Sequence, residues 1–145
     1  MAKKVIILII IGTSVYLAFG WFVFDFLLGA YTDNNTTHLS GFKKTADQFI
    51  TPYLVLSCAA YSALLVFVLV YLTAIRSVIK GTITAAIIGI LVAIMADAYW
   101  LASSNFYNNI YVAVADVIGA AASVGFTGFV ITVLSNKIPP FLRGM

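Results

Sequence analysis

The chain has 145 residues, of which 63% are hydrophobic and 9% are charged, and it contains no glutamate. A mean hydropathy of +1.08 indicates an integral membrane protein and argues against a soluble domain. The net charge of +3 comes from basic residues at the ends of apolar segments, which indicates membrane topology and no nucleic-acid partner. The single cysteine, Cys58, leaves no intrachain disulfide and no thiolate metal site.

The first apolar segment covers residues 5–28 and follows two lysines. It is longer than the apolar core of a signal peptide and has no small-residue cleavage site, so we expect an uncleaved membrane helix. Residues 31–48 are polar and are predicted to form the one substantial loop. The second segment, residues 50–75, opens at a Thr-Pro pair, because a capping hydroxyl and a proline suit the first turn of a helix.

Two further apolar segments, residues 82–101 and 110–134, complete the chain. About 20 helical residues at about 1.5 Å each cross a hydrocarbon core of about 30 Å, so all four segments can span a membrane. The short links on either side of the third segment predict antiparallel neighbours. The sequence therefore predicts an all-α fold, with one domain over residues 1–145 that forms an up-down-up-down four-helix transmembrane bundle.

Lysine and arginine are unevenly distributed between the two sides of this bundle. If both termini are cytoplasmic, only Lys43 and Lys44 lie outside. The basic residues on the inner side are then Lys3, Lys4, Arg76, Lys80, Lys137 and Arg143. The positive-inside rule thus predicts a multi-pass protein of the cell (inner) membrane with cytoplasmic N- and C-termini.

Small residues recur at steps of four along the third and fourth segments. Gly89 and Ala93 belong to the stripe on the third, and Gly119 and Ser123 to the stripe on the fourth. Such faces let membrane helices approach one another closely. We interpret them as helix-packing residues, either in a seam between these two helices or in a homodimer face.

Three aspartates lie inside the predicted spans. Asp97 is about six residues before the polar loop at 103–109 and Asp116 about seven after it, so both lie roughly 10 Å deep on antiparallel helices. An acid at that depth costs about 2.5 to 3.5 kcal/mol on insertion scales, so both should face protein or water. Asp25 is nearer the outer surface.

No Lys, Arg or His lies inside any span to balance these acids. Two close carboxylates in a low dielectric cannot both ionise readily, so we expect a shared proton, a bound cation or a water-filled vestibule. The pocket around them is predicted to be lined by Trp21, Tyr53, Ser57, Tyr61, Trp100 and Asn105. The alternative is structural: Asp25 snorkels to the interface, and the other two acids bond to Tyr, Ser or Asn side chains.

Several chemistries have no matching motif in the sequence. There is no Ser-His-Asp set, no H-E-x-x-H and no Gly-rich phosphate loop with a lysine. No histidine lies in a span to hold a haem. We therefore predict no catalytic residues, no cofactor, no resident metal and no enzymatic activity.

Short patterns near the outer ends of the helices resemble those of known proteins. They are Gly20-Trp21, Gly81 with Gly89, Ala96-Asp97-Ala98-Tyr99, and Ala115-Asp116-Val117-Ile118-Gly119. In these the chain resembles uncharacterised families of small four-helix bacterial integral membrane proteins. Those families often carry Trp-Gly after the last acid, where this chain has Val117-Ile118-Gly119. The resemblance implies architecture and bacterial origin, and no function.

Two functions remain open at this point. In the first, the protein is non-catalytic and packs in the lipid bilayer as a homo-oligomer or as an accessory subunit of a larger membrane complex. In the second, it is a proton- or cation-linked transporter or channel that binds a proton or a small cation at the acids in its outer half.

Overall fold

The computed structural model describes residues 2–38, 48 and 50–138. The elements in chain order are α1 (Ala2–Trp21), the π-helix η1 (Phe22–Leu27), α2 (Gly29–Asn35), α3 (Thr51–Val66), the π-helix η3 (Phe67–Leu72), α4 (Val78–Ser103) and α5 (Ile110–Lys137). Within the described ranges the only β pairing is an isolated bridge between Thr36 and Tyr107. Lys43, Lys44 and Arg143, which entered the topology prediction, lie outside these ranges.

Four helical stretches are long and apolar enough to cross a membrane. They are Lys3–Leu27, Thr51–Leu72, Val78–Ser103 and Ile110–Lys137. The prediction of a helical chain with four long apolar helices is confirmed for the described residues. The third apolar helix was predicted to begin at residue 82, but α4 begins at Val78. The Ser77 side chain accepts a hydrogen bond from the Lys80 N–H and caps the helix there.

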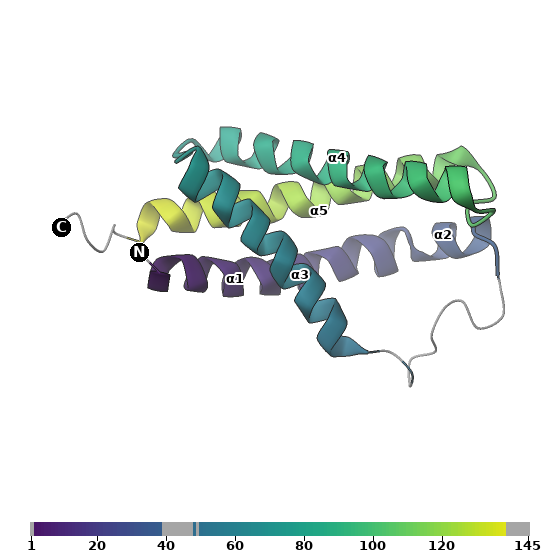
Figure 1. Ribbon diagram of the computed structural model, residues 1–145, viewed down its shortest axis with the longest axis horizontal. Helices are drawn as coiled ribbons and strands as arrows, with labels where there is room; N and C mark the ends of the chain where they lie inside the picture. Colours follow the sequence, from purple (N-terminus) through teal and green to yellow (C-terminus); the bar gives the residue numbers. More distant parts are fainter. Residues whose placement is uncertain (1, 39–47, 49, 139–145) are drawn as a thin grey trace.

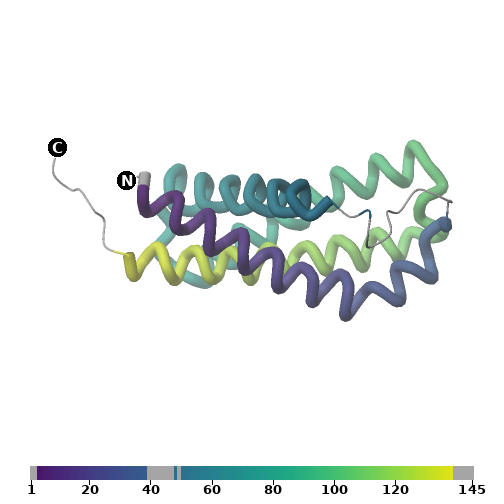
Figure 2. Tube along the Cα trace, turned by 90° about the horizontal axis from the view of Figure 1, so that it is seen from below, coloured from purple at the N-terminus to yellow at the C-terminus, as the bar shows by residue number. Residues whose placement is uncertain are grey.

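The elements α1, η1 and α2 follow one another directly, and we call them together the first rod. The first rod is longer than the sequence predicts. A π-turn closes η1, where the Leu28 N–H donates to the Val23 carbonyl at 3.0 Å, and α2 then continues to Asn35. The prediction of a loop from residue 31 onward was therefore wrong for 31–35. Figures 1 and 2 both show α2 reaching the turn that joins α4 to α5, which places the end of the first rod beside that turn.

α4 and α5 form the most closely packed pair of helices, antiparallel along their whole length (Figure 1). A Cβ atom built on Gly128 would lie 2.1 Å from the Ala85 Cβ, and one on Gly89 would lie 2.9 Å from the Ala120 carbonyl oxygen. Glycine is thus needed at these positions for the two backbones to approach this closely.

Gly119 faces a different neighbour from the one expected. A Cβ atom there would lie 2.9 Å from side-chain atoms of Phe24 and Leu28, so this glycine packs against η1 and the residue that follows it. Ala93 and Ser123 are buried. Small residues on α5 therefore serve two partners, α4 on one side and α1 with η1 on the other.

α3 crosses the other helices obliquely and packs chiefly against α1 (Figure 1). Its first seven residues, 51–57, are all exposed, while its later turns reach the core. The buried core cluster consists of Leu8, Leu65, Val66, Leu69, Ala85, Val124 and Ile131. The N-terminal half of α3 thus stands away from α4 and α5.

Charge is divided between the two ends of the molecule. The end where α1 starts and α5 finishes carries Lys3, Lys4, Arg76, Lys80 and Lys137, and we call it the basic end. The opposite end carries Asp25, Asp33, Asp97 and Asp116, and we call it the acid end.

Candidate functional site

Asp97 and Asp116 meet at the acid end, between α4 and α5. The buried residues of α4 are Gly81, Ala85, Gly89, Ala93 and Asp97, so the aspartate continues the small-residue stripe that packs on α5. Asp97 is only 5% exposed. The Asp116 carboxyl on α5 is within reach of a side-chain hydrogen bond to Asp97, and the two groups repel one another when both are charged.

One oxygen of Asp97 has a donor and the other has none. The Tyr107 hydroxyl donates to Oδ1 at 2.7 Å, while Oδ2 is buried without a partner among the described residues. Ionised carboxylates can only accept hydrogen bonds, so a bond between Asp97 and Asp116 requires a proton on one of them. The pair therefore has a place for one proton.

A latch between the first rod and the α4–α5 turn holds Tyr107 in position. The Thr37 N–H donates to the Phe106 carbonyl at 2.8 Å, and the Asn108 N–H donates to the Asn35 carbonyl at 3.0 Å. The Asn109 side-chain amide also donates to the Asn35 side-chain oxygen at 2.9 Å. These bonds involve residues on both sides of Tyr107 in the turn. The latch therefore fixes the backbone of Tyr107 where the tyrosine hydroxyl reaches Asp97.

Tyr107 itself stays neutral in this setting. Burial raises the pKa of its hydroxyl, and the hydrogen bond to Asp97 together with the charges of Asp97 and Asp116 raises it further. The neutral phenol is a hydrogen-bond donor, which suits a carboxylate acceptor.

Two tyrosine rings pack against one another between α1 and α3. The rings of Tyr16 on α1 and Tyr61 on α3 are 5.2 Å apart between centroids. Tyr16 is within electrostatic range of Asp116, Tyr61 and Cys58. Polar groups from α1, α3, α4, α5 and the turn at 104–109 therefore form one cluster across the helices.

Asp97 also borders a groove on the outside of the α4–α5 pair. The groove has a volume of about 280 Å³ and is almost entirely apolar. Its lining consists of Ile94, Asp97, Ala98, Leu101, Ala113, Val114, Val117 and Ile118. Asp97 therefore lines a shallow apolar groove on this flank.

Other predicted site residues are exposed or pack at the end of a helix. Asp25, Trp21, Tyr53 and Ser57 are exposed, with Trp21 at 63% and Tyr53 at 68%. Trp100 packs its ring near Tyr99 and Phe106 at the helix end. Asn105 is exposed in the turn, where its carbonyl accepts from the Thr37 hydroxyl and so belongs to the latch. Among the predicted lining residues, Tyr61 is the one in the cluster.

Tyr107 and Tyr16 were not among the predicted site residues. Tyr107 stands ten residues after Asp97, across a short turn, and a phenol so near a buried acid is a signal that the sequence contains. Tyr16 has no comparable local signal, because its relation to Asp116 depends on how α1 packs on α5.

The described residues contain no group of three or more His, Cys, Asp or Glu that could hold a metal ion. The cluster offers two carboxyls and a phenol, which fits a proton or a small monovalent cation. The chain matches no protein-family model, no curated protein and no solved structure.

Proposed function

We propose that the protein is a four-helix bundle that spans the inner membrane up-down-up-down, and that it moves protons, or a small cation in exchange for them, through the Asp97–Asp116 pair. The observation that carries the proposal is the contact of two carboxyls on a stretch, residues 81–136, that contains no Lys, Arg or His. Acids inside a membrane that face protein interior mark proton and ion pathways.

The energetics of the pair favour reversible binding of one positive charge. Two ionised carboxylates in contact repel one another strongly in a low dielectric, and Asp97 Oδ2 lacks a donor among the described residues. A bound proton removes the repulsion and supplies the missing donor at the same time. The groove beside Asp97 reaches the surface of the α4–α5 pair.

The charge division supports the orientation in the membrane. The basic end carries five Lys and Arg of the described ranges, and the acid end carries four Asp. Positively charged ends are retained in the cytoplasm, so both termini face it and the acid pair lies in the outer half of the bundle.

The test uses purified full-length protein in liposomes that contain a pH-sensitive dye, with a potassium diffusion potential as the driving force. Asp97→Asn and Asp116→Asn are expected to lower proton flux at least about tenfold, because an amide cannot exchange a proton. Asp25→Asn is the matched control, since Asp25 is exposed whereas Asp97 is buried. Wild-type flux in both pair variants overturns the proposal.

Infrared spectroscopy separates proton binding from transport. The wild-type protein should show the carboxylic-acid stretch of a buried protonated acid, and either pair variant should remove or shift it. If this band depends on the pair while no flux is found, transport is overturned. The proton site then remains as a structural one.

A second candidate function, packing in an assembly, is favoured by the placement of α3. Residues 51–57 of a predicted span stand exposed, including Ser57, and Asp25 is exposed on η1 at the same end. Polar groups that face lipid are unfavourable, so a second copy or a larger complex would cover them. Mild-detergent extraction is expected to yield a homo-oligomer or a stoichiometric complex. A monodisperse monomer contradicts this candidate.

A further inference from the structure

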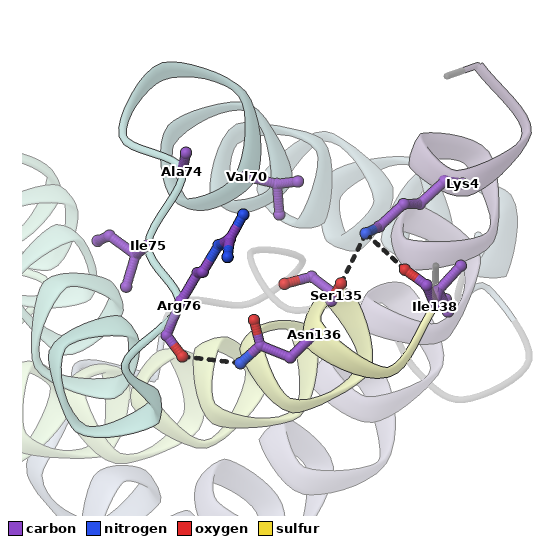
Figure 3. A pocket seen from close by; sticks show the side chains of 8 residues that line it. All are labelled: Lys4, Val70, Ala74, Ile75, Arg76, Ser135, Asn136 and Ile138. Atoms are coloured by element: carbon purple, nitrogen blue, oxygen red, sulfur yellow. Dashed lines mark hydrogen bonds between the residues drawn. The ribbon is translucent and has the colours of Figure 1, made fainter. Parts of the chain in front are cut away.

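The basic end contains a cavity that the proposed proton site does not use. It has a volume of about 600 Å³, within the range of small-molecule sites. The lining residues are Lys4, Val70, Ala74, Ile75, Arg76, Ser135, Asn136 and Ile138 (Figure 3). They come from the start of α1, the end of η3, the turn before α4 and the end of α5.

A hydrogen bond to its backbone carbonyl fixes the position of Arg76 beside this cavity. The Asn136 side-chain amide donates to the Arg76 carbonyl at 2.7 Å, which ties the turn to the end of α5. Ala74, two residues earlier, has a φ of 46°, a left-handed conformation that favours glycine and is strained in alanine. The guanidinium points into the cavity (Figure 3), and no described residue bonds to it.

Lys4 brings a second positive charge to the same space. Its ammonium donates to the carbonyls of Ser135 at 2.6 Å and Ile138 at 2.9 Å, so it covers the negative end of α5 (Figure 3). An ammonium has three N–H donors, and these two bonds leave one for a ligand. All the described aspartates lie at the acid end, so no carboxylate of the described residues balances Lys4 and Arg76 here.

We infer that this cavity binds a phosphate group, carried by an anionic lipid headgroup or by a soluble phosphate compound. The Arg76 fork suits two phosphate oxygens, and Lys4 adds a point charge. Val70, Ile75 and Ile138 provide an apolar wall that fits the glycerol and first acyl carbons of a lipid. Basic pockets between helices at the cytoplasmic side of a membrane take such headgroups.

The experiment measures the unfolding temperature of the full-length protein in phosphate-free detergent during three titrations. The additions are phosphatidylglycerol, phosphatidylcholine with the same acyl chains, and inorganic phosphate. Arg76→Gln removes the guanidinium and keeps the backbone carbonyl that Asn136 binds. Lys80→Gln is the matched control, because it loses the same charge at the basic end but does not line the cavity.

Phosphatidylglycerol is expected to stabilise the wild type and Lys80→Gln, with a half-saturating concentration about tenfold higher in Arg76→Gln. Phosphatidylcholine should stabilise far less. If inorganic phosphate alone reproduces the Arg76-dependent shift, the ligand is a soluble phosphate. Equal weakening in Arg76→Gln and Lys80→Gln, or equal stabilisation by both lipids, overturns the inference, because diffuse charge or acyl-chain contact then explains the result.

Discussion

The acid end and the basic end differ in how far apart in sequence their hydrogen-bonded residues are. At the acid end, Tyr107 and Asp97 are ten residues apart and bond directly, and the carboxyls of Asp97 and Asp116 meet across the same hairpin. At the basic end, Lys4 bonds to carbonyls 131 and 134 residues away, and a cavity of about 600 Å³ remains. The hydrogen bonds of the acid end thus join residues of one hairpin, while those of the basic end join distant parts of the chain.

The reason for this difference lies in how many chain segments meet at each end. A short turn joins α4 to α5, so the polar groups on either side of it are close in sequence and in space. The hydrogen bonds that join Asn35 and Thr37 to this turn add one further segment. At the basic end the start of α1, the turn before α4 and the end of α5 converge without being joined closely in sequence. Proximity along the chain brings polar groups together at the acid end, whereas only the packing of distant segments does so at the basic end.

The strongest way to break this comparison is to force α4 and α5 apart. Gly128→Ala is expected to lower the free energy of unfolding by about 3 kcal/mol, because the new Cβ would lie 2.1 Å from the Ala85 Cβ. Titration of mixed micelles with dodecyl sulfate measures this change. Gly20→Ala is the control, since nothing lies within 4 Å of a Cβ there. Equal losses in both variants would show that the seam is not tightly packed.

A smaller change tests the hydrogen bond between Tyr107 and Asp97 at the acid end. Tyr107→Phe is expected to lower the free energy of unfolding by about 2 kcal/mol, because Asp97 Oδ1 loses its donor while buried. Tyr111→Phe is the matched control, since Tyr111 is 71% exposed. The same dodecyl sulfate titration applies. If the two variants are equally stable, the Tyr107 bond contributes nothing to stability.

The same pair of variants gives a pH dependence. The pKa of Tyr107 is raised above its usual value of about 10, so the unfolded chain loses that proton first as the pH rises. The stabilisation is therefore complete below about pH 10 and is lost above it. Between about pH 10 and pH 12, stability should fall less in Tyr107→Phe than in wild type or Tyr111→Phe. Parallel curves would contradict the raised pKa.

The mildest change tests the basic end. Lys4→Met is expected to lower the free energy of unfolding by about 1 kcal/mol, because the carbonyls of Ser135 and Ile138 lose a charged donor. Lys3→Met is the control, because Lys3 is exposed and bonds to no described residue. Chemical unfolding curves of the two variants, compared in one detergent, measure the difference. A larger loss in Lys3→Met would contradict the capping role of Lys4.

Local pattern explains which parts of the fold were predictable. The four helices follow from the long apolar runs. In an apolar environment about 20 successive residues must satisfy their backbone N–H and C=O groups internally, and a helix does this. The helix through residues 31–35 was missed because its sequence is polar, and its support comes from the latch to the α4–α5 turn. Gly119 was predicted to pack along a small-residue stripe, yet which helix it meets depends on the position of η1.

The candidate site divides in the same manner. Asp97 and Asp116 could be placed at one depth by counting residues from a shared turn. The neighbourhoods of Asp25, Trp21, Tyr53 and Ser57 depend on the oblique course of α3 and the rotation of the first rod. No periodicity in the sequence encodes either.

By itself, the sequence determined four long apolar helices, an excess of basic residues at one end and two acids flanking one turn, because helix formation and hydropathy act over short stretches of chain. Only the tertiary structure decided that Tyr107 bonds Asp97, that Tyr16 lies near Asp116, and that Arg76 and Lys4 share a cavity. These arrangements join residues from separate helices, and their geometry is set by the crossing and rotation of those helices as they pack.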